Sequence, residues 1–195
     1  MSTGLRILIA DDEPLIRLGL KAMLTELGHQ PLVAGNGREA LQLARRQRPD
    51  LAILDIKMPY TDGLQAARTL SRTQPLPILL LTAFSDQALI QEATDLPIHG
   101  YLVKPVSEGE LAAAIAVALK RFADAQRLAA KVGQLETKLT TRLLVDRAKA
   151  KLMAAGLDEA GAFQAIQRRA RTSRRTMAEV ARAILQEDRR DDTGA

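Results

Sequence analysis

Short apolar runs alternate with amphipathic segments over the first 106 residues of the 195-residue chain. Each run is four to six residues long, mostly apolar throughout, and bounded by Gly, Pro or polar residues. Uninterrupted apolar runs of this length are typical of strands that are covered on both faces. Five strands are therefore expected, at residues 5–10, 31–34, 51–55, 77–82 and 100–104.

The segments between these runs have helical character. Apolar residues recur between Leu15 and Leu24 with helix-like spacing, and Gly28 follows as a C-terminal stop. Strands that alternate with helices form parallel sheets with right-handed crossovers. The pattern thus predicts an α/β fold, a flavodoxin-like doubly wound sheet of five parallel strands.

The pattern changes after Val106. No Pro occurs in the rest of the chain, and Ser107 with Glu110 forms a capping-box signature for the start of a long helix. Apolar residues in this helix step by three and four positions, the heptad spacing of a coiled coil, at Ala125, Leu128, Val132, Leu135 and Leu139. This spacing favours a homodimer, and the alternative is a lone helix folded back on its own domain.

The last part of the chain predicts a small three-helix all-α domain. Gly156 ends the long helix, and Asp158 is placed to cap a second helix with one apolar face, made of Ala162, Phe163, Ile166 and Ala170. Thr176 and Glu179 form a capping box for a third helix, whose inward positions are Met177, Val180, Ala181, Ile184 and Leu185.

These patterns predict four segments. Residues 1–122 are expected to form the α/β domain and residues 123–142 a coiled-coil linker helix. Residues 143–188 are then the three-helix domain, and residues 189–195 a flexible polar tail.

Composition narrows the setting of the protein. Aromatic residues make up 3% of the chain and Cys is absent, so the cores must be aliphatic and thiolate metal sites are excluded. The N-terminus is not expected to be a signal peptide, and the longest uncharged apolar run, Leu111 to Leu119, is too short to span a bilayer. A soluble cytoplasmic protein without a membrane partner is expected.

The net charge of +5 is concentrated in the C-terminal part. Residues 1–122 hold 13 basic and 13 acidic side chains, whereas residues 123–195 hold 15 basic and 10 acidic ones. The stretch RRARTSRR, from Arg168 to Arg175, places five positive charges in eight residues. This asymmetry indicates a separate anion-binding unit.

Chemically active side chains follow four of the predicted strands. Ligands of a doubly wound sheet bind beyond the C-terminal strand ends, and here those ends carry Asp11, Asp12, Asp55, Thr82 and Lys104. Three carboxylates in one place repel each other unless a cation lies between them, and oxygen ligands suit Mg²⁺. The hydroxyl and the ammonium would complement an anion such as a phosphoryl group.

This set resembles the signature of the receiver domain of two-component response regulators, over about residues 4–122. The matching residues are Asp11-Asp12, Asp55 with Met58-Pro59 and Gly63, Thr82-Ala83, and Lys104-Pro105. The resemblance implies that Asp55 accepts phosphate from a sensor histidine kinase. It also implies that Asp11, Asp12, Asp55 and the backbone carbonyl of Lys57 hold Mg²⁺.

The same resemblance implies roles for three further residues. Lys104 would pair with the phosphoryl oxygens, and the hydroxyl of Thr82 would move to the phosphoryl group while Tyr101 turns inward. A phosphatase of the haloacid dehalogenase type is the enzyme alternative, but it needs Asp-x-Asp-x-Thr/Val where this chain has Asp11-Asp12-Glu13-Pro14. A regulatory protein is therefore expected, not a metabolic enzyme.

The basic residues of the C-terminal part do not line one recognition helix. Arg168 and Arg171 fall on an outward helix face, Arg174 and Arg175 lie in a turn, and Arg169 flanks the core side. A patch spread over helices and a loop suits an irregular, phosphate-rich surface such as folded RNA.

Residues 135–188 also resemble the ANTAR domain of transcription antiterminators. The resemblance is carried by Ala148-Lys149, Leu152-Met153, Ala162-Phe163, Ile166, Ala170, Met177 and Val180-Ala181, with Ala150 and Gln167 as departures from the usual Gly and Arg. It implies binding to paired hairpins of leader RNA. The residues expected to contact RNA are Lys149, Arg168, Arg171, Arg174 and Arg175.

Together these features predict a phosphorylation-dependent RNA-binding antiterminator that acts as a dimer on activation. The alternative is a receiver-controlled regulator whose helical domain binds DNA or a protein.

Overall fold

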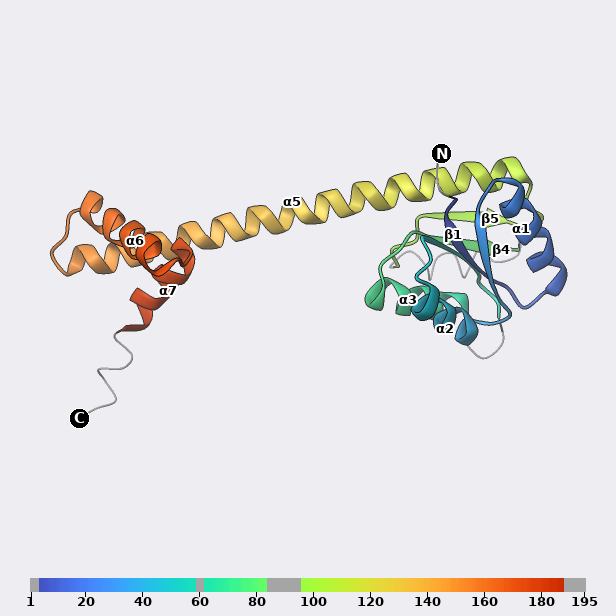
Figure 1. Ribbon diagram of the computed structural model, residues 1–195, viewed down its shortest axis with the longest axis horizontal. Coiled ribbons are helices and arrows are strands. Elements are labelled where there is room, and N and C mark those ends of the chain that lie inside the picture. The colour runs from blue at the N-terminus through green and yellow to red at the C-terminus, as the bar shows by residue number, and fades with distance from the viewer. Residues whose placement is uncertain (1–3, 59–61, 84–95, 188–195) are drawn as a thin grey trace. The chain divides into compact units, whose positions relative to one another are not determined.

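The computed structural model describes residues 4–58, 62–83 and 96–187. The chain divides into two compact units, residues 1–126 and 127–195. The helices and strands of the described residues are shown in Figure 1. None of the helices in these ranges is long and apolar enough to cross a bilayer.

The first unit is built on one parallel sheet with the strand order β2-β1-β3-β4-β5. Its strands are β1 (Arg6–Ala10), β2 (Gln30–Ala34), β3 (Leu51–Asp55), β4 (Ile78–Thr82) and β5 (Gly100–Val103). Its helices are α1 (Pro14–Glu26), α2 (Gly37–Gln47), α3 (Gly63–Thr73) and the first part of α5 (Glu108–Ala154). The expected strands are confirmed to within one residue at each end, because their apolar runs match the strand lengths.

Alternate residues of the strands enter two different cores. Odd-numbered positions of β1, β3 and β4, such as Ile7, Ile53 and Leu79, pack with α1 and α5 on one face. Even-numbered positions, such as Leu8 and Leu54, pack with α2 and α3 on the other face (Figure 1). Burial on both faces explains why the runs contain few polar residues, and the doubly wound α/β fold is confirmed.

Helix α5 is the long helix that the sequence predicts. The Ser107 hydroxyl accepts a hydrogen bond from the Glu110 amide at 3.3 Å, and Glu110 Oε2 accepts one from the Ser107 amide at 2.9 Å, so the capping box forms. The heptad residues along the middle of the helix are exposed, from 45% for Val132 to 64% for Leu128. An exposed apolar stripe is consistent with pairing, and the homodimer stays a prediction.

The second unit is a bundle of the end of α5 with α6 (Glu159–Ser173) and α7 (Met177–Gln186). Gly156 has a φ of +102° just after α5, and Asp158 caps α6 by accepting a hydrogen bond from the Gly161 amide. Thr176 and Glu179 form the predicted capping box of α7. The core is small and aliphatic, consisting of Val145, Ala148, Ile166, Ala170, Val180, Ala181 and Ile184.

One core prediction for this bundle is wrong. Phe163 was expected on the inward face of α6, but its side chain is 43% exposed. The buried stripe of α6 is narrow and consists of Ala162, Ile166 and Ala170, so the residue one position beyond Ala162 lies outside it. Successive residues of a helix are rotated by about 100° about its axis, and this rotation is enough to move Phe163 out of the narrow contact that Ala162 makes.

Candidate functional site

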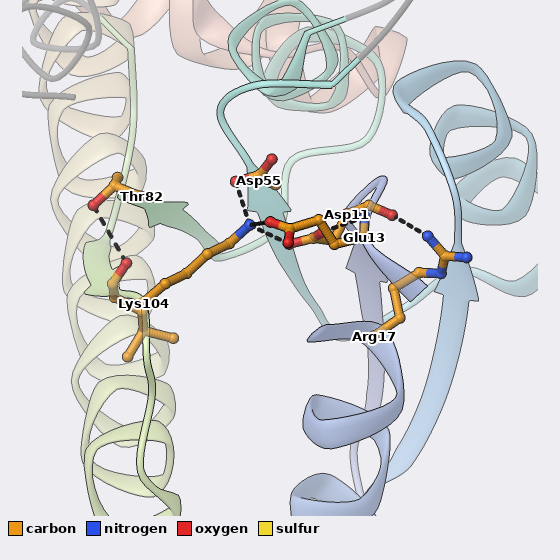
Figure 2. Close-up of polar contacts among 7 residues, drawn as sticks. Asp11, Glu13, Arg17, Asp55, Thr82 and Lys104 are labelled. Carbon is orange, nitrogen blue, oxygen red and sulfur yellow. Dashed lines mark hydrogen bonds and ion pairs between the residues drawn. The ribbon is translucent and has the colours of Figure 1, made fainter. Parts of the chain in front are cut away.

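The predicted site residues meet at one edge of the sheet, beyond the C-terminal ends of the strands. Asp11 follows β1, Asp55 is the last residue of β3, Thr82 is the last of β4, and Lys104 follows β5. Figure 2 shows the Lys104 side chain reaching across this edge toward the carboxylates of the other strands. The parallel arrangement of the strands brings these residues together from positions far apart in the sequence.

Three carboxylates form the acidic part of the site. Oxygens of Asp11, Asp12 and Asp55 lie within 4.8 Å of one another, with Asp11 and Asp55 buried and Asp12 exposed. Hard oxygen ligands beside an open, solvent-facing side are the donor set that Mg²⁺ prefers. The backbone carbonyl of Lys57 comes from the segment just after β3.

Lys104 supplies the positive charge of the site. Its Nζ lies 2.8 Å from Oδ2 of Asp11 and 3.2 Å from Oδ1 of Asp55. The buried Oδ2 of Asp11 has no other polar partner among the described residues. Burial lowers the pKa of Lys104, but the hydrogen bonds to Asp11 and Glu13 outweigh it and raise the pKa well above its usual range.

The electrostatics of Asp55 are those of a buried acid in a crowded site. Burial raises the pKa of Asp55 to about 6; the charge of Lys104 lowers it, and that of Asp11 raises it further. The carboxylate is thus costly to ionise in the metal-free protein, and a bound cation would favour its charged form.

Backbone contacts hold the acidic residues in place. The Arg17 guanidinium donates a hydrogen bond to the Asp11 carbonyl at 2.7 Å (Figure 2), and the Glu13 amide donates to Oδ1 of Asp11 at 2.8 Å. At the other strand, a β-carbon on Gly63 would overlap the carbonyl oxygen of Asp55. This close approach of α3 to the end of β3 explains why position 63 is glycine.

Thr82 and Tyr101 occupy the part of the site toward β5. Thr82 is fully buried, and its hydroxyl donates to the Leu102 carbonyl at 3.5 Å. Tyr101 is 40% exposed on β5. Pro59 lies outside the described residues, and so does the segment 84–95 that follows Thr82 and Ala83.

Sequence reasoning missed Glu13 and Arg17. Oε1 of Glu13 lies 3.1 Å from Nζ of Lys104, so a third carboxylate shares the ammonium with Asp11 and Asp55. The acidic run at residues 11–13 was the only available signal for Glu13. Nothing in the local pattern of α1 indicates that Arg17 turns back to the Asp11 carbonyl.

The basic residues of the bundle differ in whether their side chains are held in ion pairs. Arg168 and Arg171 are exposed on α6, while Arg174 caps α6 in a left-handed conformation and Arg175 follows it in the loop. Lys149 instead forms an ion pair with Glu159 at 2.6 Å. Sequence reasoning expected Lys149 to contact RNA, yet its ammonium is already engaged within the bundle.

Arg169 is engaged as well. Its guanidinium makes two hydrogen bonds to the Glu187 carboxylate, the shorter at 2.7 Å, and so links α6 to the residue after α7. Sequence reasoning placed Arg169 toward the core side, whereas its side chain is 56% exposed. The ion pair depends on how α7 packs on α6, which the local sequence does not reveal.

Comparison with known proteins identifies both units. Residues 7–116 match the family described as response regulator receiver domain, and residues 133–185 match the ANTAR domain. The transcriptional regulatory protein PdtaR of Mycobacterium tuberculosis is 44% identical over 183 residues, covering 93% of this chain and 89% of that protein. The transcriptional regulatory protein AfsQ1 of Streptomyces coelicolor is 39% identical over 115 residues, covering 59% of this chain and 51% of its own length.

Solved structures agree with these matches. The response regulator receiver domain protein of Clostridium thermocellum has a TM-score of 0.57 at 30% identity, covering 60% of this chain and 95% of that one. The signal receiver domain of a modulated diguanylate cyclase from Desulfovibrio desulfuricans has a TM-score of 0.58 at 34% identity, covering 61% and 96%. The chain therefore belongs to the two-component response regulators, with a receiver domain followed by an ANTAR domain, the RNA-binding type of output module.

Proposed function

We propose that this response regulator is phosphorylated on Asp55 by a sensor histidine kinase, binds hairpins of leader RNA and acts as a transcription antiterminator in the cytoplasm. The observation that carries the first part is the buried Asp55 carboxylate, 3.2 Å from Lys104 and clustered with Asp11 and Asp12. The ANTAR match and the transcriptional relative in Mycobacterium tuberculosis support the second part.

The proposed chemistry is phosphoryl transfer to a carboxylate. An oxygen of Asp55 attacks phosphorus, the bond from phosphorus to the kinase histidine nitrogen breaks, and the electron pair stays on that nitrogen. Lys104 pairs with the phosphoryl oxygens as their charge develops. Asp11, Asp12, Asp55 and the Lys57 carbonyl would hold Mg²⁺, which neutralises charge on the transferred group.

The proposed switch uses Thr82 and Tyr101. The Thr82 hydroxyl now bonds weakly to the Leu102 carbonyl, and it would exchange this partner for a phosphoryl oxygen. Tyr101, half exposed on β5, would then turn inward. This exchange changes the surface of β5 and the coiled-coil pairing that we expect of α5.

Four arginines are the proposed RNA contacts, because they are exposed and cationic: Arg168, Arg171, Arg174 and Arg175. Lys149 contributes only when its ammonium leaves Glu159. Pairing of two chains through the exposed stripe of α5 would present two such surfaces to two hairpins.

Labelling with a small phosphodonor such as acetyl phosphate tests the receiver. We expect Mg²⁺-dependent labelling that is lost in Asp55→Ala. Asp62→Asn is the matched control, because Asp62 is an exposed helix cap and Asn retains that cap. Labelling that survives in Asp55→Ala would overturn the assignment of the acceptor.

Gel shifts across a salt series test the output. A two-hairpin RNA should bind more tightly than duplex DNA of equal length, and Arg168→Ala with Arg171→Ala should weaken binding and flatten its salt dependence. Arg169→Ala is the control, since Arg169 is paired with Glu187. Equal or tighter binding to duplex DNA would favour a DNA-binding regulator instead.

A further inference from the structure

The ANTAR bundle exposes its only aromatic side chain. Phe163 is the sole aromatic residue among residues 127–195. Large aromatic side chains usually supply core area, but the bundle core is filled by Ala, Val and Ile while the Phe163 ring is 43% exposed. The core of the bundle therefore does not account for the Phe163 ring, and we look for its role at the surface.

Phe163 lines an apolar hollow of about 480 Å³ formed by α5, α6 and the start of α7. Val145 and Met177 contribute the other apolar walls, and Thr137 and Thr141 lie at its side. A hollow of this size lies within the range of small-molecule sites. It has room for a flat ring laid against Phe163.

The rim of the hollow is mostly cationic. Lys138, Arg142 and Lys149 stand around it with Asp146 as the one acid of the lining, and Lys149 is paired with Glu159 outside the lining. Lys138 has no ion pair among the described residues, and Arg142 meets Asp146 only at 3.9 Å with both side chains exposed. An apolar floor under a positive rim complements a nucleotide, whose base is apolar on its faces and whose phosphate is negative.

We propose that this hollow binds an unpaired RNA base, stacked on Phe163 with its phosphate toward Lys138 and Arg142. The proposal rests on the RNA-binding function above and adds a stacking site to the phosphate contacts made by the arginines. A second copy of the chain fits less well, because it would bring the same positive rim against this one.

The test uses the full chain and an RNA of two hairpins, selected from a pool with randomised loops for binding to the wild-type protein. Phe163→Ala should lower the affinity about tenfold or more, because loss of one stacked base has an effect of that order. The salt dependence should stay as in the wild type, since no phosphate contact is lost. Phe163→Trp should bind as tightly as the wild type.

Met153→Ala is the matched control, because Met153 is also 43% exposed but does not line the hollow. A fluorescent 2-aminopurine, placed in turn at each loop position, should be quenched by the wild type at one position and not by Phe163→Ala. If Phe163→Ala melts early, Phe163→Leu replaces it, because Leu keeps an apolar side chain without a ring.

The outcomes separate the two proposals. Unchanged affinity in Phe163→Ala or Phe163→Leu, with wild-type binding intact, would overturn the stacking site alone. A loss of affinity that accompanies a loss of dimer in sedimentation would also overturn it and assign the hollow to a second copy. If no RNA from the pool binds the wild type, the RNA-binding function itself fails.

Discussion

The receiver and the ANTAR bundle use positive charge in opposite ways. In the receiver, one ammonium, that of Lys104, is only 16% exposed and is shared by three carboxylates. In the bundle, Arg168, Arg171, Arg174 and Arg175 are exposed, and none has an ion pair within the described part of the chain.

The difference reflects the size of the anion that each region is proposed to receive. A single phosphoryl group needs a few charges held at fixed positions, and a buried site keeps them strong and unscreened. A nucleic acid offers many phosphates at a mobile surface, where exposed cations gain affinity by releasing counterions. Substitutions should therefore have large effects in the receiver and small effects on the stability of the bundle.

Removal of the buried ammonium should have the largest effect. Without Mg²⁺, Lys104→Met leaves Asp11 and Asp55 facing each other without a cation and should lower the free energy of unfolding by about 3–5 kcal/mol. Added Mg²⁺ should restore part of this loss, because it binds the folded state. Chemical denaturation with and without EDTA measures both effects, with the exposed Lys120→Met as control. Equal stability of Lys104→Met and wild type in EDTA would contradict a buried charge cluster.

The charge of Asp55 should itself oppose folding in the metal-free protein. The folded pKa of Asp55, about 6, lies above the ordinary 3.8, so the folded state favours the protonated carboxyl. The stability that this protonated form contributes is complete below pH 4 and is lost as the pH rises through 6. Asp55→Asn should thus be more stable than wild type at pH 7.5 by at most about 3 kcal/mol, with 1.4 kcal/mol per pKa unit. Denaturation at a series of pH values checks this, and a gain that persists at pH 4 would argue against it.

In the bundle, the next largest effect is expected from an uncharged group, the Thr176 hydroxyl in the capping box of α7. Thr176→Ala removes the hydroxyl that accepts from the Glu179 amide at 3.2 Å and should cost about 1 kcal/mol. Hydrogen exchange of the α7 amides is the measurement, because it reports this helix alone. Thr172→Ala, on the exposed surface of α6, is the control and should leave exchange unchanged.

The smallest effect is expected for the ion pair between Lys149 and Glu159. Glu159 is 72% exposed, so water and salt screen the pair despite its 2.6 Å distance. Lys149→Met should shift the melting of the bundle less than Thr176→Ala, and at about 1 M salt the shift should vanish. A shift larger than that of Thr176→Ala would break the contrast between the two regions.

The sequence predicted the fold and the acidic cluster well, for a physical reason. The strands are buried on both faces, so their apolar runs have clear ends, and the ends of parallel strands meet at one edge. Asp11, Asp12 and Asp55 could be placed together from these two facts alone, and they do lie within 4.8 Å. Their roles in phosphorylation and Mg²⁺ binding stay predictions.

Contacts that depend on side-chain direction could not be predicted in this way. Glu13 reaches Lys104 across 91 positions of sequence, and Arg169 reaches Glu187 only because α7 returns along α6. Phe163 fits the apolar pattern of α6, yet the narrow stripe that packs in the bundle excludes it. Such features follow from how neighbouring elements pack and not from the period of one helix.

The position of Asp55, the proposed phosphoacceptor, depends on the uncharged Gly63 as well as on its charged neighbours. Because α3 begins against the carbonyl of Asp55, every side chain larger than hydrogen at this position must displace the end of β3 or the start of α3. The geometry of the acidic cluster thus depends on the absence of a β-carbon at Gly63, eight residues after Asp55. A change as small as one methyl group, at a position that carries no charge, would displace Asp55, the proposed phosphoacceptor, while leaving every residue of the site in the sequence.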